Sequence, residues 1–318
     1  MSSKNATETV AADAGGIARA VAILERGGLV AVPTETVFGL AARADSDEAV
    51  TAIYRAKGRP DFNPLIVHVA NGEAARELAD FPPGAAELMD RYWPAPLTLV
   101  LPARSDVRLA PAVTAGLPTV ALRSPAHPVM QALLAQCDFP LAAPSANRSG
   151  FVSPTSPAHV LRTLDGRIDL VLDGGADCEN GLESTILAIR GDGSWEELRP
   201  GPVDLEALHR DFGRGPLLSS SPEGALEAPG QMTSHYAPGK PVRLDALRAE
   251  DDEFFIGFGA IAGDVSLSAE GDLATAAASL YACLHRAASS AKPKIAVASV
   301  PNEGIGIAIN DRLRRAAA

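Results

Sequence analysis

Apolar positions between residues 15 and 209 recur alternately at the spacing of a helix and at the spacing of a buried strand. Residues 17–26 have helical spacing and precede two glycines, whereas residues 29–32 form a continuous apolar run that ends at Pro33. Further strands are predicted over residues 64–69, 97–101, 119–123, 141–143, 170–172 and 184–189, and further helices over residues 84–92, 128–136, 157–164 and 205–212. This alternation predicts a mixed α/β architecture.

One helix and the strand after it bring several polar residues together. Ser46 is a suitable N-cap for the helix that precedes Lys57. Lys57 and Arg59 then lie at or just past the end of this helix, in a turn that contains a glycine. In the strand that follows, Ile66 and His68 share one face because side chains alternate along a strand.

The periodic pattern stops between residues 213 and 240, which are rich in Gly, Pro and Ser and are typical of a linker. Beyond it, strands are predicted over residues 254–257 and 294–298, and helices over residues 274–288 and 310–315. The sequence therefore predicts a flexible N-terminal segment (1–14), a first domain (15–212), a linker or lid (213–240) and a small C-terminal α/β domain (241–318).

Composition narrows the function classes. A chain of 318 residues with 47% hydrophobic and 21% charged residues fits a globular protein of about two domains. The net charge of −11 disfavours a broad nucleic-acid-binding face, since such faces bind phosphates through clustered Lys and Arg. No secretory signal, membrane span, disulfide framework or zinc motif is apparent, so we expect a cytoplasmic location and no metal held by the protein.

Two short polar segments combine groups that suit a polyphosphate. Lys57 and Arg59 offer a mobile point charge and a planar fork, while Ser145 and Asn147 add a hydroxyl and an amide. An isolated Lys-x-Arg after a helix is most often a pair of solvated charges, and Pro-Ser-Ala-Asn alone is a weak motif. The combination, with prolines bracketing the first segment, favours ligand binding.

Other candidate positions are less specific. Residues 33–36, Pro-Thr-Glu-Thr, follow a buried strand at the end where α/β sheets bind ligands, but a Thr-rich turn explains them equally well. His68, in an apolar strand, is as readily a satisfied core residue as a ligand. No nucleophile elbow, kinase signature or metal-binding histidine pair is present, and the glycines of residues 257–263 do not fit the dinucleotide fingerprint.

The motifs PTETVFGL, KGRP followed by NPLIVHV, WPAPLTLVL, TAGLPTVALRSPAHP, APSAN, SPT, DGG, ESTI, LRPGP and HYAP occur in this order. With them the chain resembles the YrdC/Sua family of threonylcarbamoyl-AMP synthases over about residues 15–212. The remainder is similar to the extension of the longer Sua-type members. The resemblance implies a YrdC-like twisted mixed-sheet domain with a smaller Sua-type α/β domain. Phe38 and residues 151–152 depart from the usual pattern.

The resemblance also implies an activity, the synthesis of threonylcarbamoyl-adenylate from L-threonine, bicarbonate or CO2, and ATP accompanied by phosphate-bound Mg²⁺. A separate transferase complex then modifies adenosine 37 of tRNA to N6-threonylcarbamoyladenosine (t6A). The implied catalytic, nucleotide-binding tetrad is Lys57, Arg59, Ser145 and Asn147. The implied ATP site adds Asn63, Thr119, Ser153, Arg199 and Tyr236. The implied threonine site is Thr36, His68, Arg123 and Ser184.

Two alternatives are weighed against this function. A carbamoyltransferase of hydrogenase maturation shares a YrdC-like domain but carries Cys-rich zinc fingers, which three scattered cysteines do not match. A nucleotide- or RNA-binding YrdC-like module without catalysis is disfavoured by the acidic charge, and direct tRNA binding is expected to be weak or absent.

Overall fold

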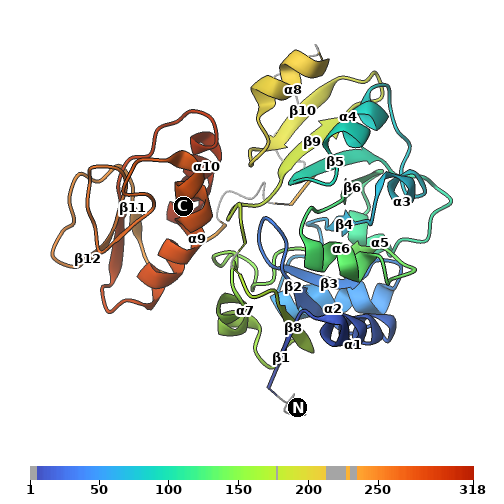
Figure 1. The fold of residues 1–318 in the computed structure, drawn as a ribbon, viewed down its shortest axis with the longest axis horizontal. Helices are drawn as coiled ribbons and strands as arrows, with labels where there is room; N and C mark the ends of the chain where they lie inside the picture. Colours follow the sequence, from blue (N-terminus) through green and yellow to red (C-terminus); the bar gives the residue numbers. More distant parts are fainter. Residues whose placement is uncertain (1–5, 177, 213–226, 230–234) are drawn as a thin grey trace.

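The computed structural model describes residues 6–176, 178–212, 227–229 and 235–318. They form two α/β domains, a large one whose helices and strands lie between residues 8 and 212 and a small one whose helices and strands lie between residues 242 and 317 (Figure 1). Most of the predicted linker or lid therefore lies outside the described residues. No helix in the described part of the chain is long and apolar enough to cross a membrane.

The large domain is built on one mixed sheet of ten strands, in the order β1-β8-β2-β3-β7-β4-β6-β5-β9-β10. The strands are β1 (Glu8–Ala11), β2 (Val30–Val32), β3 (Gly39–Arg43), β4 (Ile66–His68), β5 (Leu97–Pro102), β6 (Thr119–Arg123), β7 (Leu141–Ala142), β8 (Leu170–Asp173), β9 (Thr185–Ile189) and β10 (Trp195–Arg199). The mixed α/β prediction is confirmed. The expected flexible terminus is wrong for residues 8–11, which pair in parallel with β8.

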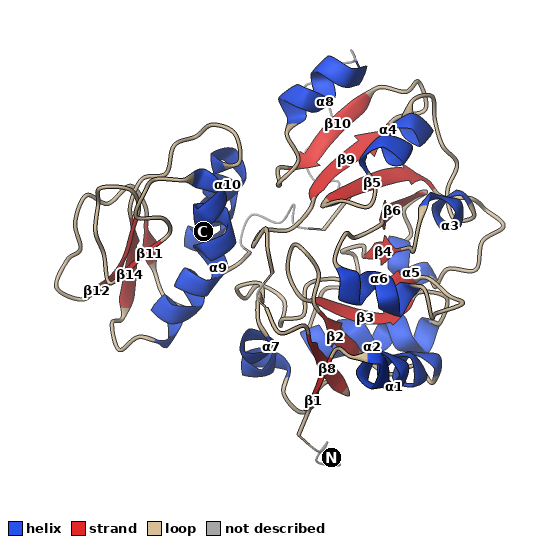
Figure 2. Ribbon diagram, viewed as in Figure 1, coloured by secondary structure: helices blue, strands red, loops and turns tan. Residues whose placement is uncertain are grey.

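Helices cover both faces of this sheet (Figure 2). They are α1 (Ala14–Glu25), α2 (Asp47–Lys57), α3 (Gly72–Arg76), α4 (Ala85–Tyr92), α5 (Pro111–Thr114), α6 (Pro128–Leu134), α7 (Pro157–Leu164) and α8 (Leu205–Phe212). Because strand side chains alternate, Val30 and Val32 pack in one core cluster with residues of α1 and α6, whereas Ala31 packs in another with residues of α2 and α5.

Helix α2 delivers two of the predicted site residues. The Ser46 side chain accepts a hydrogen bond from the Ala49 N–H at its start, and Gly58 ends the helix in the left-handed conformation, with φ of 58°. This reversal turns the chain at Lys57 and directs Arg59 back towards the sheet.

Strand β4 follows the predicted alternation. Leu65, Val67 and Val69 belong to the large core cluster on one face of the sheet. Ile66 lies on the opposite face, in a small cluster formed by strand residues and Ala228, to which no described helix contributes. His68 shares that face, so part of the sheet there is left open for a cavity.

The small domain has four parallel strands in the order β11-β14-β12-β13. These are β11 (Val242–Arg243), β12 (Glu253–Gly257), β13 (Val265–Ser266) and β14 (Lys294–Val297), with helices α9 (Leu273–Ser289) and α10 (Gly306–Ala317). The two helices lie between this sheet and the large domain (Figure 2).

Candidate active site

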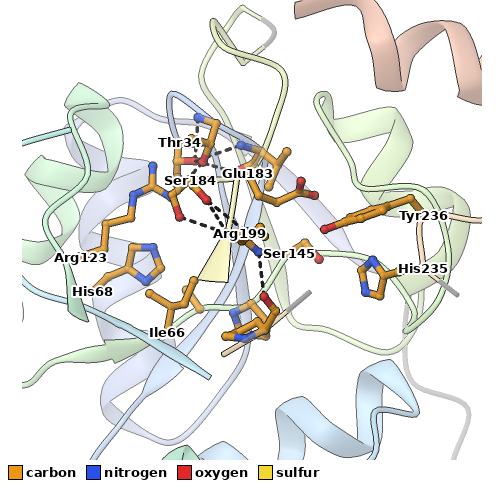
Figure 3. Close-up of a pocket in the computed structure, with 16 residues that line it drawn as sticks. Thr34, Ile66, His68, Arg123, Ser145, Glu183, Ser184, Arg199, His235 and Tyr236 are labelled. Atoms are coloured by element: carbon orange, nitrogen blue, oxygen red, sulfur yellow. Dashed lines mark hydrogen bonds between the residues drawn. The ribbon is translucent and has the colours of Figure 1, made fainter. Parts of the chain in front are cut away.

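A cavity lies on the open face of the large sheet, and its wall combines residues from β4, β6 and the loops around them. In Figure 3, His68 and Arg123 lie on one side of this cavity and His235 and Tyr236 on the other. All four residues of the predicted threonine set are in the wall, which are Thr36, His68, Arg123 and Ser184.

Arg123 and Glu35 form a buried ion pair beside the cavity. The Arg123 Nη2 is 2.5 Å from Glu35 Oε1, and Nη1 donates to the Thr36 hydroxyl at 3.0 Å. The Thr36 hydroxyl is in turn 2.8 Å from that of Thr34. Burial alone would raise the pKa of Glu35, but the guanidinium beside it keeps that pKa lowered.

Three buried polar atoms near this pair have no partner among the described residues: Arg123 Nε, Glu35 Oε2 and His68 Nδ1. Burial and the nearby Arg123 lower the pKa of His68 to about 3, so its ring is neutral at physiological pH. Buried polar groups normally find partners, and this end of the cavity therefore suits a small ligand that carries both donors and acceptors.

Ser184 is held from two sides. Its hydroxyl is 2.7 Å from the Thr98 hydroxyl and accepts a hydrogen bond from Arg199 Nη2 at 3.1 Å. Arg199 also donates to the Ser184 carbonyl through Nε at 3.1 Å and Nη2 at 2.9 Å. Arg199 is thus both a wall residue and the support of Ser184.

The predicted nucleotide tetrad does not converge as four free groups. The Lys57 ammonium donates to the carbonyls of Ser145 and Asn147, each at 2.6 Å, and the side chain is buried behind their turn. Burial lowers the pKa of Lys57 well below its ordinary value, with a further contribution from Arg59. Of the tetrad, Ser145 alone lines the cavity.

Arg59 is also engaged within the protein. Its Nη2 donates to Asn63 Oδ1 at 2.6 Å and to the Pro64 carbonyl at 2.9 Å. Burial lowers the pKa of Arg59 to about 10. Strands β4 and β6 are parallel, and His68 and Arg123 lie at their C-terminal ends. Pro64 precedes β4 and Thr119 begins β6, so both lie at the N-terminal end of this pair of strands.

The remaining predicted ATP residues are divided. Arg199 and Tyr236 are in the cavity wall, whereas the Ser153 hydroxyl donates to Glu183 Oε1 at 2.5 Å and does not line the cavity. Tyr236 is buried and has a left-handed backbone, with φ of 63°. Its neighbour Ala237 bridges to Phe151, next to the Ser145 turn.

Sequence reasoning did not select Glu35, Glu183 or His235. Both carboxylates occur inside the quoted motifs PTETVFGL and ESTI, but an acidic residue in a motif does not reveal which cation it will face. His235 lines the cavity, and burial lowers its pKa to about 3. No group of three His, Cys, Asp or Glu side chains that could hold a metal ion occurs among the described residues.

Comparison with known proteins gives consistent likenesses. The Sua5/YciO/YrdC family model, described as "Telomere recombination", matches residues 22–201, and "Threonylcarbamoyl-AMP synthase, C-terminal domain" matches residues 203–318. Threonylcarbamoyl-AMP synthase of Bacillus subtilis is 40% identical over 95% of this chain and 92% of its own length. That of Pyrococcus abyssi is 37% identical over 93% and 92%.

A similar structure is the crystal structure of P. abyssi Sua5 complexed with L-threonine. It superposes with a TM-score of 0.86 at 34% identity, covering 98% of this chain and 96% of that one. The likeness therefore includes both domains.

Proposed function

Since the chain belongs to the Sua5/YciO/YrdC family of threonylcarbamoyl-AMP synthases, we propose that it makes L-threonylcarbamoyladenylate from L-threonine, bicarbonate or CO2, and ATP, releasing pyrophosphate. It is accordingly a nucleotidyltransferase. The product would supply a separate transferase complex that modifies adenosine 37 of tRNA to t6A, in the cytoplasm.

The observation that carries this proposal is the single cavity wall that contains the whole threonine set, with Ser145 beside it. Arg123 Nε has no hydrogen-bond partner among the described residues, so it can donate a charge-assisted hydrogen bond to the carboxylate of an amino acid while the two terminal nitrogens hold Glu35 and Thr36. The Thr36 and Ser184 hydroxyls and the neutral His68 ring suit the hydroxyl and amine of threonine.

Part of the predicted ATP set, Asn63 and Thr119, lies at the end of the parallel strands β4 and β6 that is opposite His68 and Arg123. Arg123 lies four positions after Thr119 in β6, which corresponds to about 13 Å along an extended strand. We propose that threonine binds near Arg123 and the ATP phosphates near Ser145, so that both substrates meet over the open sheet face. Lys57, Arg59, Asn63 and Asn147 would support the nucleotide end by fixing the backbone around it.

In the reaction, the threonine amine and bicarbonate give N-carboxythreonine with loss of water. An oxygen of the new N-carboxylate then forms a bond to the α-phosphorus of ATP. The bond from that phosphorus to the oxygen that bridges it to the β-phosphorus breaks, and pyrophosphate leaves. Holding these groups in line is the main contribution asked of the protein. Arg199 and the Ser145 hydroxyl, which both belong to cavity-wall residues, would stabilise the developing charge.

The two carboxylates nearest the cavity are unsuited to hold Mg²⁺. Glu35 is paired with Arg123 and Glu183 with Arg312, so neither offers a free ligand set. We therefore propose that any Mg²⁺ reaches the site on the ATP phosphates, and no step of the mechanism depends on a metal held by the protein.

The decisive experiment is mass-spectrometric detection of threonylcarbamoyl-adenylate from purified protein, ATP, threonine and bicarbonate. Omission of any one substrate should abolish the product, and pyrophosphate should appear with it. Pyrophosphate release that does not need threonine would favour a different carbamoyl-transfer enzyme. Nucleotide binding with no product in a fresh, cold reaction would favour a module without catalysis.

A further inference from the structure

Three loops of the large domain insert apolar side chains into the core of the small domain. Val37, Val152 and Leu182 share one hydrophobic cluster with residues of α9, α10 and the small sheet. Each lies within two positions of a predicted site residue, because Val37 follows Thr36, and Leu182 lies two residues before Ser184. The small domain therefore packs directly under the loops that form the cavity wall.

The two domains approach each other closely at Gly181. A Cβ atom on this residue would lie 2.5 Å from the Ala278 Cα in α9 and 2.5 Å from the Ala278 carbonyl oxygen. Gly181 also has a left-handed backbone, with φ of 64°. The loop that carries Glu183 and Ser184 is thus seated on the backbone of α9, where only glycine fits.

Glu183 is the polar centre of this interface. Its Oε2 accepts hydrogen bonds from Arg312 Nε at 2.9 Å and from the Tyr281 hydroxyl at 2.8 Å, while Oε1 accepts one from Ser153 at 2.5 Å. Arg312 and Tyr281 come from α10 and α9, and both side chains are completely buried. A carboxylate held by three donors from both domains has little freedom to move.

Glu183 itself lines the cavity, yet no described residue of the small domain does. The small domain therefore reaches the site through this carboxylate, through the loops on either side of it, and through the wall residue Tyr236, whose ring packs against Tyr281 and Arg312. Two site residues depend on Glu183 directly. Ser153 donates a hydrogen bond to its carboxylate, and Ser184 is the next residue in the sequence.

We propose that Arg312 and Tyr281 are positioning residues for adenylate formation, because they fix Glu183 and thereby hold Ser153 and Ser184 in place. The inference rests on the proposed function and assigns a role to the small domain within it. The competing explanation is that the Arg312–Glu183 pair only joins the domains, in which case it affects stability and leaves the kinetic constants of the folded enzyme unchanged.

The test compares Arg312→Gln and Tyr281→Phe with the control variant Arg315→Gln. Arg315 lies in the same helix, α10, and its ion-pair partner is Asp311. Product formation, the KM for threonine and ATP, and threonine affinity by calorimetry are measured on the full chain, well below each variant's unfolding temperature. We expect kcat/KM to fall about tenfold or more in Arg312→Gln and severalfold in Tyr281→Phe, which keeps the ring and removes one donor. Arg315→Gln should remain at the wild-type value.

Lower thermal stability with unchanged kcat, KM and threonine affinity in both variants would overturn the inference. If Arg312→Gln does not fold, Tyr281→Phe decides the question alone. Absence of product from the wild-type protein would contradict the proposed function instead, and threonine affinity in the variants would still test the positioning.

Discussion

The Lys57 ammonium lies 2.6 Å from the carbonyl oxygen of Ser145, although 88 residues separate the two in the sequence. A second carbonyl, that of Asn147, lies at the same distance from the same ammonium. The cation thus holds two carbonyls of a turn whose residue Ser145 lines the cavity, and it supports the proposed nucleotide end of the site from outside the cavity.

We therefore predict that Lys57→Ala lowers adenylate synthesis by roughly thirtyfold to several hundredfold, equivalent to about 2–4 kcal/mol of transition-state stabilisation. Arg59→Ala should have an effect of the same size, because it removes the guanidinium that donates to Asn63 Oδ1 and to the Pro64 carbonyl. Initial rates of product formation check both. Arg55→Ala, an exposed cation in the same helix, serves as the control, and wild-type turnover in the folded Lys57 or Arg59 variants would contradict the assignment.

Breaking the buried Arg123–Glu35 pair should separate stability from activity. Arg123→Gln leaves the Glu35 carboxylate buried without its cation, so the free energy of unfolding should fall by about 3–5 kcal/mol. The double variant Glu35→Gln/Arg123→Gln should regain most of that stability. It should remain inactive, because the guanidinium that donates to the substrate carboxylate is still missing. Denaturant unfolding and product assays test this, and recovery of activity in the double variant would show that Arg123 does not bind substrate.

The cavity should prefer threonine to related amino acids. Serine keeps the hydroxyl and loses a methyl worth about 1 kcal/mol, so its rate should fall by roughly fivefold. Valine lacks the hydroxyl that could pair with a buried polar atom of the wall such as His68 Nδ1, and leaving that atom unpaired costs about 1–3 kcal/mol. Competition assays with the three amino acids give the order, and equal turnover of valine and threonine would rule out this pocket.

Stability should fall as the pH drops below about 6.5. Burial lowers the pKa of His68, His235 and His285 to about 3 from an ordinary 6.5, so between these values the unfolded chain binds protons that the folded chain does not. Each contributes a slope of about 1.4 kcal/mol per pH unit. Glu183, with a pKa of about 2 against an ordinary 4.5, adds to this loss only below pH 4.5.

His285→Gln isolates one of these contributions. The rings of His285 and His159 stack with their centroids 3.8 Å apart. The backbone carbonyl of His285 accepts a hydrogen bond from Arg162, and its ring Nε2 lies 3.1 Å from the Ser153 carbonyl oxygen. In urea unfolding at about pH 7.5 and about pH 5.5, the variant should lose about 1.4 kcal/mol less stability between the two pH values than the wild type, because the unfolded histidine takes up its proton only below about pH 6.5. An identical pH dependence in both proteins would contradict the prediction.

Tyr236 should matter more for synthesis than for folding. Its ring lies 5.7 Å from that of Tyr281 and beneath the Arg312 guanidinium at 5.5 Å, and it forms part of the cavity wall. Tyr236→Ala opens that wall to water, which would expose a hydrolysable adenylate, whereas Tyr236→Phe keeps the ring. The cavity left by the ring lowers the melting temperature of the Ala variant. We expect the Ala variant to give much less product than the Phe variant when both are assayed well below their melting temperatures. Full product yield from Tyr236→Ala would show that the residue is not needed for closure.

Much of the fold follows from local signals in the sequence. The capping residue Ser46 and the apolar alternation of residues 65–69 predict α2 and β4 to within a residue or two of the observed elements. Strand β1 was not predicted because Glu8–Ala11 is short and largely exposed, so it carries no apolar pattern, and only pairing with β8 makes it a strand.

The site was predicted less completely, for a physical reason. Residue types reveal which groups can bind an anion, but the partner that each group meets depends on tertiary contacts. Lys57 was expected to offer a free charge, yet it binds two carbonyls of a distant turn. Glu183 was not selected, because its role depends on Arg312, which lies 129 residues further along the chain.

The glycine contact between Gly181 and α9 links two equilibria that are usually considered separately. A substrate that orders the cavity loops would also favour the loop conformations against which the small domain packs. Thermodynamic reciprocity requires that the effect of substrate on docking equals the effect of docking on substrate affinity. If docking of the small domain raises the affinity for threonine, threonine must make the domains harder to separate by the same factor. The threonine concentration would then influence how often the two domains separate. Separation, and with it the loss of folded protein, would be more frequent when threonine is scarce.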